Sequence, residues 1–255
     1  MSSNPVVVLT GAASGIGAAL LPLLVRERYQ VVASDLSSLP ENEEYRSFSC
    51  DVSDHKQVDR LFDFAIEQFG RIDIFIANAG FAYFEKTKTA DWERTEKIYK
   101  VNTISPIYST HKMKALHGSQ PFQVMITASA MSHWPLPGYA QYASTKAALH
   151  AFAATYRHEL DQGQHLQLVY PIGTRTSFFD RADHSPKPLM TQSAEHVARA
   201  MLKGIRSKQK AIYPSLIFQA AFKLNRIFPI FKSIAVAIEK RSFKKWVELR
   251  WVQED

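Results

Sequence analysis

The feature that most constrains the fold is a glycine-rich loop between an apolar run and a helical pattern near the N-terminus. Residues 5–10 read Pro-Val-Val-Val-Leu-Thr, which is typical of a strand buried on both faces of a parallel sheet. Glycines at 11, 15 and 17 follow, and apolar residues then recur at helical spacing as far as Leu24. A glycine loop alone can be only a turn, but strand, loop and helix in this order present backbone N–H groups to a phosphate. The sequence therefore predicts an α/β fold that binds a nucleotide.

Each glycine of the loop has a physical reason. Gly11 permits a tight turn that a side chain would not tolerate, and Gly15 lets backbone N–H groups approach a pyrophosphate. Gly17 lets the helix pack against the strand. The G-x-x-x-G-x-G spacing differs from the G-x-G-x-x-G dinucleotide fingerprint, although the physics is shared.

A second expected strand, residues 30–34, ends at Asp35, which is 24 residues after Gly11. A carboxylate in this place can accept hydrogen bonds from both ribose hydroxyls of an adenosine, and it would repel a 2′-phosphate. Neither Ser34 nor Leu36 is basic, and the glycine loop holds no Arg or Lys. The alternative is an Asp that only caps a turn. We expect the ribose role, and hence NAD in preference to NADP.

Tyr142 and Lys146 are four residues apart, and Ser129 precedes the tyrosine by thirteen residues. In a helix this spacing places the ammonium group beneath the phenol ring. A fixed cation favours phenolate and would lower the pKa of Tyr142 from its usual value of about 10. Such a phenol suits a general base for alcohol oxidation or a general acid for carbonyl reduction. The same spacing also occurs where a solvated lysine lies beside a half-buried tyrosine, so the interpretation depends on the glycine loop as well.

Together these motifs resemble the short-chain dehydrogenase/reductase family over roughly residues 5–205. Residues 10–17 match the family's T-G-x-x-x-G-x-G, and Asp51-Val52 resembles the D-V pair that meets the adenine. Asn78-Ala79-Gly80 matches the N-A-G motif that steadies the central sheet. The family's catalytic tetrad is matched, in order and approximate spacing, by Asn102, Ser129, Tyr142 and Lys146.

The resemblance implies hydride transfer between a nicotinamide cofactor and a secondary alcohol or ketone. Tyr142 would be the acid/base, Ser129 would hydrogen-bond the reacting oxygen, and Lys146 would hold the nicotinamide ribose and lower the Tyr142 pKa. Asn102 would kink its helix and hold a water that links Lys146 to solvent, and Thr176 would contact the nicotinamide carboxamide. The residues that the resemblance assigns to the cofactor are Gly11, Ser14, Gly15, Ile16, Gly17, Asp35, Asp51, Val52, Asn78, Ala79, Gly80, Tyr142, Lys146, Pro171 and Thr176.

Two positions depart from the family pattern. Ala77 stands where the family usually has Asn, which is a mild change. Pro171-Ile172 stands where a P-G pair is expected, and Gly173 would take over the turn, shifted by one residue. A branched Ile cannot easily adopt the conformations that glycine allows, so the nicotinamide pocket would be reshaped. A nucleotide-binding sensor or scaffold with little catalysis is therefore kept as the alternative to an enzyme.

Length and composition fit a doubly wound, Rossmann-like parallel sheet of about seven strands with helices on both faces. The chain has 255 residues and 46% apolar content, enough for a substantial core. Expected strands at 46–50 and 72–77 flank an expected helix at 54–69, which implies right-handed crossovers. We divide the chain into a dinucleotide-binding catalytic domain, residues 1–212, and a C-terminal extension, residues 213–255.

Residue counts also bear on compartment, metals and assembly. The single Cys50 excludes an intrachain disulfide, and residues 1–4 lack the basic and apolar character of an export signal, so we expect a cytoplasmic protein. The nine histidines show no zinc-like Cys/His spacing, so we expect no metal. Small residues in helices near 102–117 and 142–161 predict a homodimer or homotetramer.

Positive charge is concentrated near the C-terminus. Residues 203–250 contain twelve Lys or Arg and two Glu, so this segment carries +10 and the rest of the chain −3. Its longest uncharged run, residues 211–222, is too short for the ~20 residues that span a bilayer. One hypothesis is peripheral contact with anionic lipid, which would make the protein a membrane-surface lipid keto-reductase. The other is that the extension covers the last strand or a subunit interface. We do not expect a nucleic-acid partner, because the sequence contains no recognition module.

Two segments that border the substrate in the family are rich in Met, Trp, Leu and Phe. They are residues 130–138 and the run Ser177-Phe178-Phe179. They favour an apolar alcohol or ketone, although lid packing or a dimer contact explains them equally well. His133 is expected to form a loop hydrogen bond and not to act as an extra catalyst. We expect a substrate lid near residues 176–195, with a mobile part at 180–192.

Overall fold

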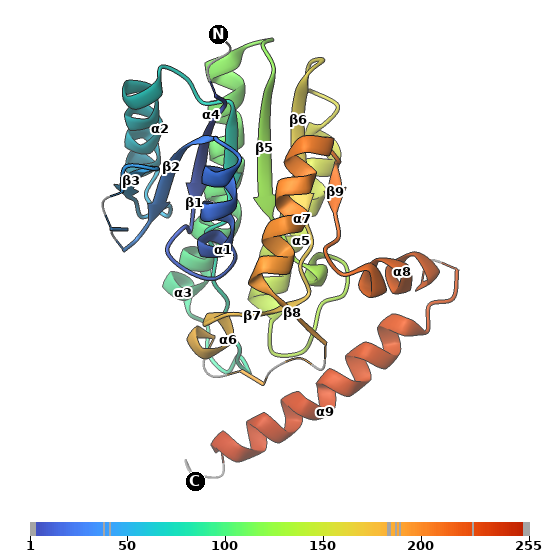
Figure 1. Ribbon diagram of the computed structural model, residues 1–255. Helices are drawn as coiled ribbons and strands as arrows, with labels where there is room; N and C mark the ends of the chain where they lie inside the picture. The colour runs from blue at the N-terminus through green and yellow to red at the C-terminus, as the bar shows by residue number, and fades with distance from the viewer. Residues whose placement is uncertain are drawn as a thin grey trace.

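A seven-stranded parallel sheet forms the centre of the computed structural model, which describes residues 4–37, 39–40, 42–182, 185–186, 188, 190–225 and 227–251 (Figure 1). The strands lie in the order β3-β2-β1-β4-β5-β6-β9, and every pair is parallel. The predicted α/β class and the number of strands are confirmed. The strand bounds are Val6–Thr10 (β1), Gln30–Asp35 (β2), Arg46–Ser49 (β3), Ile74–Ala77 (β4), Phe122–Thr127 (β5), Gln164–Val169 (β6) and Ala211–Ile212 (β9).

The chain starts in the middle of the sheet and winds outward in both directions. From β1 it passes through α1 (Gly15–Arg26) to β2 and β3, and α2 (His55–Phe69) then returns it to β4 on the other side of β1. Ligands of such sheets bind at the carboxyl ends of the strands, where the strand order reverses. Because the glycine loop follows β1, the topology places it at that point. Residues 1–3 of the N-terminus lie outside the described residues.

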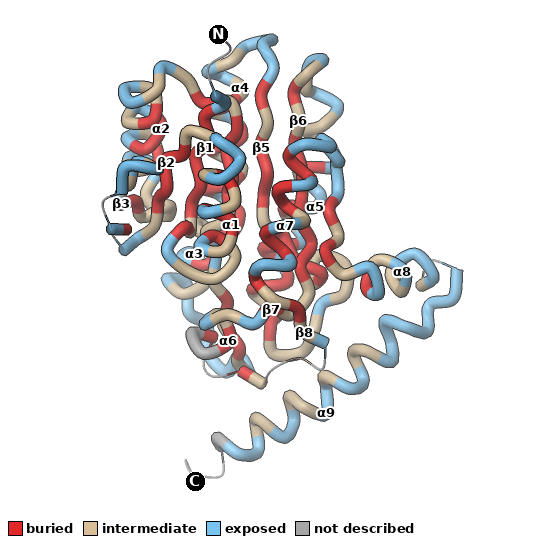
Figure 2. Tube along the Cα trace, in the orientation of Figure 1, coloured by how far each residue is buried: buried red, intermediate tan, exposed pale blue. Residues whose placement is uncertain are grey.

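Helices cover both faces of the sheet (Figure 1). α1 and α7 (Ala194–Ser207) pack on one face, and α2, α4 (Ser105–His117) and α5 (Ala140–Tyr156) pack on the other. Figure 2 shows the buried residues running along the strands and the inner sides of these helices. Helix residues with no exposed surface include Leu20, Leu24, Leu61, Met113, Leu149 and Met201.

The helix predicted at 54–69 is confirmed as α2, and its ends follow from its flanking residues. The Asp54 carboxylate accepts a hydrogen bond from the N–H group of Lys56, which satisfies one free donor of the first turn. Gly70 ends the helix with φ of +76°, the left-handed conformation that glycine adopts without strain.

The expected lid region contains a short helix and a small second sheet. α6 (Phe178–Arg181) lies between β7 (Gly173–Arg175) and β8 (Thr191–Ser193), which pair in parallel. The Tyr139 hydroxyl donates to the Ser185 hydroxyl at 2.8 Å, which ties this region to the start of α5. Residues 183, 184, 187 and 189 of the expected lid lie outside the described residues. The predicted mobility stays a prediction.

Two helices, α8 (Leu216–Asn225) and α9 (Phe231–Trp251), follow the last strand of the sheet. α9 passes beneath α6 and the β7–β8 pair and extends beyond the body of the domain (Figure 1). Of its residues whose burial is described, none is buried (Figure 2). Arg226 and residues 252–255 of the extension lie outside the described residues. In the described chain, every helix is too short or too polar to cross a membrane.

Candidate active site

The glycine loop after β1 adopts the conformations that its residues predict. Gly11 and Gly15 have φ of +68° and +56°, in the region where a side chain would be strained. A Cβ atom on Gly17 would overlap the carbonyl oxygen of Gly11, so only glycine lets α1 begin this close to the strand. Backbone geometry therefore requires glycine at all three positions.

Two polar side chains join the glycine loop to the segment that follows β4. The Thr10 hydroxyl accepts hydrogen bonds from the N–H groups of Asn78 and Ala79 at 3.1 and 3.2 Å. The Asn78 side chain donates to the carbonyl oxygens of Thr10 and Gly11 at 3.2 and 3.1 Å. It also accepts from the Thr127 hydroxyl at 3.0 Å. These bonds fix the ends of β1, β4 and β5 to one another, which is the steadying role expected of the N-A-G motif.

A cavity of about 550 Å³ lies at this edge of the sheet. Its volume falls within the ~300–1,000 Å³ range of ligand pockets. Gly17 lies behind the wall, against Gly11. All other expected cofactor residues line the cavity: Gly11, Ser14, Gly15, Ile16, Asp35, Asp51, Val52, Asn78, Ala79, Gly80, Tyr142, Lys146, Pro171 and Thr176.

Asp35 ends β2 with its carboxylate against the glycine loop. Its oxygens accept hydrogen bonds from the N–H groups of Ala13 and Leu36 at 2.9 and 2.8 Å. Among the described residues that line the cavity, the basic ones are Lys97 and Lys146. Lys97 belongs to α3 (Trp92–Tyr99) and Lys146 belongs to α5. At the end of β2, therefore, the described lining residues include the negatively charged Asp35 and no basic residue.

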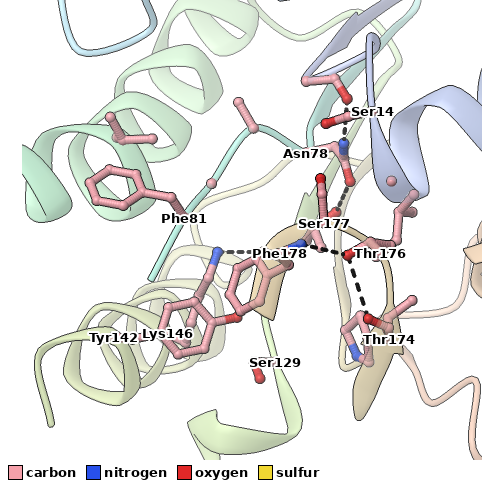
Figure 3. Close-up of a pocket in the computed structure, with 18 of the residues that line it drawn as sticks. Ser14, Asn78, Phe81, Ser129, Tyr142, Lys146, Thr174, Thr176, Ser177 and Phe178 are labelled. Carbon is pink, nitrogen blue, oxygen red and sulfur yellow. Dashed lines mark hydrogen bonds between the residues drawn. The ribbon is translucent and has the colours of Figure 1, made fainter. Parts of the chain in front are cut away.

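Three of the four expected catalytic residues line the same cavity (Figure 3). Tyr142 and Lys146 lie on α5, and Ser129 immediately precedes the short helix η2 (Ala130–Ser132). All three are buried, with 8%, 4% and 7% of their surface exposed. The Lys146 Nζ lies 5.7 Å from the centre of the Tyr142 ring and donates to the carbonyl oxygen of Thr127 at 2.8 Å. The structure thus brings together the phenol, ammonium and hydroxyl groups that the sequence pattern links.

The expected lowering of the Tyr142 pKa is wrong. Burial raises the pKa of Tyr142 to about 12, and the Ser129 side chain offsets part of that rise. Burial also lowers the pKa of Lys146 to about 7. Both side chains are removed from water, and a low dielectric disfavours the charged form of each. Tyr142 therefore holds its proton, and Lys146 changes its protonation near neutral pH.

Asn102 lies behind the cavity in a π-helical turn, η1 (Lys100–Ile104), which separates α3 from α4. A π turn interrupts the regular helix, which is the kink expected of this residue. The Asn102 side chain accepts from the N–H group of Phe81 at 3.1 Å and donates to the Phe81 carbonyl oxygen at 2.8 Å. A Cβ atom on Gly80 would lie 3.1 Å from Asn102 Oδ1 and 3.5 Å from Lys146 Nζ, so both polar groups adjoin Gly80. The water-linked proton relay stays a prediction.

The segment after β6 closes the cavity without the turn expected at Gly173. Gly173 is not among the glycines with positive φ, and it begins β7. A Cβ atom on it would lie 2.8 Å from the ring of Pro188 and 3.2 Å from the carbonyl oxygen of Met190. Glycine is therefore needed here for the close approach of the lid and not for a turn. Ile172 itself lines the cavity, so its branched side chain forms part of the wall.

Several wall residues escaped the sequence reasoning. Thr127 supplies the carbonyl oxygen that holds Lys146 and the hydroxyl that bonds to Asn78. The available signal was its position, because a polar residue that ends an apolar strand lies at the binding edge of the sheet. Phe178, expected near the substrate, lines the cavity with its ring 5.5 Å from that of Tyr142. The other lining residues that we had not singled out include Leu36, Cys50, Phe81, Tyr83, Lys97, Val101 and Ala128.

The C-terminal helices contact the loops around the site. The rings of Phe243 and Trp246 on α9 lie 5.6 and 4.7 Å from the ring of Phe84. Phe84 contacts Tyr139 at 4.8 Å, and both belong to the apolar cluster that contains Tyr142. One face of α9 therefore packs on the domain that carries the site.

Comparison with known families agrees with this geometry. The family model for short chain dehydrogenases matches residues 5–186. The chain belongs to the short-chain dehydrogenase family. It is 30% identical over 197 residues to the 1,2-dihydroxy-1,2-dihydronaphthalene dehydrogenase of Pseudomonas putida, covering 69% of this chain and 73% of the relative. It is 28% identical over 239 residues to the glycine betaine reductase ATRR of Emericella nidulans, covering 85% of this chain but only 19% of that protein.

Solved structures of other short-chain dehydrogenases share the fold. One from Burkholderia phymatum, in complex with NAD, has a TM-score of 0.76 at 20% identity, covering 88% of this chain and 93% of that one. One from Sphingobium yanoikuyae, in complex with NADPH, has a TM-score of 0.74 at 20% identity, covering 90% and 94%. This short-chain dehydrogenase is an oxidoreductase of the CH–OH class with a nucleotide-binding, Rossmann-like fold.

Proposed function

We propose that this short-chain dehydrogenase interconverts an apolar secondary alcohol and its ketone, with Tyr142 as the acid/base and NAD as the cofactor. The observation that carries the proposal is the convergence of Ser129, Tyr142 and Lys146 on a cavity whose wall also contains the glycine loop. Because Ser129 and Tyr142 line the same cavity, both hydroxyls can reach one substrate oxygen there.

The cavity wall fits a dinucleotide. Gly11 and Gly15 line the cavity beside the N-terminus of α1, which favours the negative charge of a ligand's phosphates. Asp35 would hold the adenosine ribose, and Lys146 would hold the nicotinamide ribose. When bound, the nicotinamide would supply or accept the hydride at the reacting carbon.

The pKa values of Tyr142 and Lys146 favour reduction, because reduction can begin without the prior loss of a proton from Tyr142. Tyr142, with its raised pKa, can donate its proton to a carbonyl oxygen that Ser129 holds by a hydrogen bond. Oxidation requires that Tyr142 first lose its proton. A charged Lys146, with its Nζ 5.7 Å from the centre of the Tyr142 ring, would favour that loss. The lysine can then exchange protons at neutral pH because burial lowers its pKa to about 7.

The negative charge of Asp35, at the end of β2, supports NAD in preference to NADP. The Asp35 carboxylate would repel a 2′-phosphate and accept from ribose hydroxyls. In Asp35→Ser, which removes the charge and keeps a hydrogen-bonding group, we expect the ratio of NAD to NADP affinity to fall about tenfold or more. Calorimetric titration of both cofactors measures this ratio, and an unchanged ratio would exclude the ribose role of Asp35.

Tyr142→Phe tests the reaction itself. The variant keeps the ring and its packing but lacks the proton donor, so we expect turnover to fall by about 10²–10⁴-fold at unchanged cofactor affinity. Tyr139→Phe is the matched control, because Tyr139 is also buried, its ring lies 6.1 Å from that of Tyr142, and its hydroxyl bonds to the lid. The readout is NADH turnover against a panel of aliphatic alcohols, acyl ketones and steroids. Wild-type turnover in Tyr142→Phe would overturn the assignment, and cofactor binding without turnover in the wild type would favour the sensor alternative.

Aromatic and other apolar side chains in the cavity wall support an apolar substrate. Phe81, Tyr83, Met131, Phe178 and Phe179 all line the cavity. We also propose a homodimer or homotetramer, which the exposed small side chains along α5 support, since they let a second helix approach closely. Sedimentation velocity measures that assembly.

A further inference from the structure

The C-terminal helices expose apolar side chains that the rest of the described domain leaves uncovered. At the junction of α8 and α9, Ile227, Phe228 and Ile230 are 71%, 63% and 60% exposed. We name these and their neighbours the C-terminal apolar surface: Leu216, Ile217, Leu224, Ile227, Phe228, Ile230, Phe231, Ile234 and Ile238. Figure 2 shows the exposed junction beyond the edge of the sheet. Single exposed apolar residues are common in proteins, but nine of them on two successive helices and their junction mark an interaction site.

α8 is apolar on both of its faces. Its inner face carries Phe218 and Phe222, whose rings lie 5.1 Å from Trp134 and 4.3 Å from His133. Its outer face carries Leu216, at 74% exposure, together with other members of the C-terminal apolar surface. The exposed apolar side chains of this outer face, which lie beside Lys223, need a second apolar neighbour to be buried. Within the part of the chain that the structure describes, the domain supplies a neighbour on the inner side alone.

α9 has an inner and an outer stripe. Phe243 and Trp246 face inward against Phe84. Phe231, Ile234 and Ile238 recur at three- and four-residue spacing on an exposed stripe, and Arg241 and Lys245 continue the same stripe. The outer stripe therefore changes from apolar near α8 to basic toward the C-terminus.

The charge of the two helices decides between possible occupants. Their exposed basic side chains outnumber their two acidic residues, Glu239 and Glu248. A second copy that packed through the same surface would bring like charges together, which destabilises a symmetric contact. A membrane with anionic headgroups satisfies the apolar and the basic side chains at once. The exposed basic residues are Lys223, Lys232, Lys240, Arg241, Lys244 and Lys245.

We propose that the C-terminal apolar surface docks on an anionic lipid membrane. The apolar side chains at the α8–α9 junction enter the boundary between headgroups and acyl chains, and the basic side chains contact the headgroups. α9 lies on the surface and does not cross it, in agreement with its length and polarity. The docking does not depend on the proposed reaction, because none of these residues lines the cavity.

Cosedimentation of the full chain with vesicles tests the docking. We expect the wild type to pellet with phosphatidylcholine vesicles that contain phosphatidylglycerol, less at high salt, and poorly with phosphatidylcholine alone. A triple variant, Ile227→Glu, Phe228→Glu and Ile230→Glu, should weaken binding at least tenfold. The control is Trp92→Glu, which also replaces an exposed apolar side chain by a charge; Trp92 is 77% exposed on α3 and should leave binding unchanged.

Further outcomes distinguish a membrane from a second copy of the chain, and the docking proposal from the proposed reaction. Equal pelleting of the triple variant and the wild type overturns the proposal, as does equal pelleting on neutral and anionic vesicles. A concentration-dependent dimer in sedimentation velocity that the triple variant abolishes, without vesicle binding, assigns the surface to a second copy and also overturns it. Unchanged NAD affinity of the triple variant shows that it is folded. If the Tyr142→Phe variant pellets with vesicles as the wild type does, the docking does not depend on the reaction.

Discussion

The central sheet and the C-terminal helices use the same kinds of side chain in opposite ways. Val7 and Leu9 in β1 have no exposed surface, whereas Ile227 and Ile230 beyond α8 are mostly exposed. In the sheet, helices from both sides complete each apolar face, while α8 and α9 find a partner on one side within the described chain. The comparison teaches that an apolar segment predicts a contact but does not say whether the partner lies in the same chain.

Gly17→Ala gives the largest expected effect and tests the sheet side of the comparison. The added Cβ atom overlaps the backbone of Gly11, which cannot move without opening the first βα turn, so we expect a loss of about 4 kcal/mol of unfolding free energy. Urea unfolding measures it. Gly70→Ala is the control for an uncrowded glycine: Gly70 has positive φ, which Gly17 lacks, but nothing lies within 4 Å of an added Cβ atom, so the change should cost about 1 kcal/mol. A loss at Gly17 no larger than at Gly70 would mean that the first βα turn moves to accommodate the added Cβ atom, so that crowding does not select glycine at position 17.

Leu9→Ala and Ile230→Ala compare the two regions directly. Leu9 is fully buried, so its truncation leaves a cavity and should cost about 3 kcal/mol. Ile230 is 60% exposed, and the same truncation should change stability by less than about 0.5 kcal/mol. Urea unfolding midpoints at equal m-value give both numbers. If Ile230→Ala lost more than about 1 kcal/mol of unfolding free energy in dilute protein, Ile230 would have a stabilising contact within the chain, and the contrast between the two regions would be wrong.

His133 gives the smallest expected effect, and it lies where the two regions meet. Its ring packs on Phe222 of α8, and its Nε2 hydrogen-bonds with the Tyr213 hydroxyl at 3.1 Å. Burial, helped by the nearby His150, lowers the pKa of His133 to about 4, below its ordinary value of about 6.5. Between these values the unfolded chain binds more protons at His133, so this histidine's contribution to stability is fully present above pH 6.5 and is lost as the pH drops toward 4.

In His133→Phe, therefore, the fall in Tm between pH 6.5 and 4 should shrink by about 2–4 °C. Differential scanning calorimetry at several pH values measures it. His158→Phe, at an exposed histidine after α5, is the control and should keep the wild-type pH profile. The same pH profile in His133→Phe and the wild type would show that this contact is not acid-sensitive.

Most of the fold could be predicted from the sequence, because strands buried on both faces and amphipathic helices carry strong periodic signals. The stripe of α2 and the apolar run of β1 are examples, and their predicted ends were within about two residues. The prediction of a turn at Gly173 is wrong. Glycine is needed there because Pro188, which is distant in sequence, packs too close to leave room for a side chain. Local sequence cannot distinguish a glycine needed for its φ from one needed for space.

The candidate site was predictable in its residues but not in its electrostatics. The spacing of Tyr142 and Lys146 correctly places both on one helix beside Ser129. The same spacing gives no measure of burial, and burial moves both pKa values against the charged forms. The role of Thr127 was also hidden, because the group that holds Lys146 is a backbone carbonyl, which every residue has.

The pKa of Lys146 has a consequence for chemical labelling. With a value of about 7, a substantial fraction of this side chain is a free amine at neutral pH, while an ordinary exposed lysine, with a pKa near 10.4, is almost wholly protonated. Since only the free amine is nucleophilic, a small acylating reagent that can enter the cavity would modify Lys146 ahead of the many lysines on the surface. The depressed basicity thus distinguishes Lys146 from the exposed lysines of the described chain.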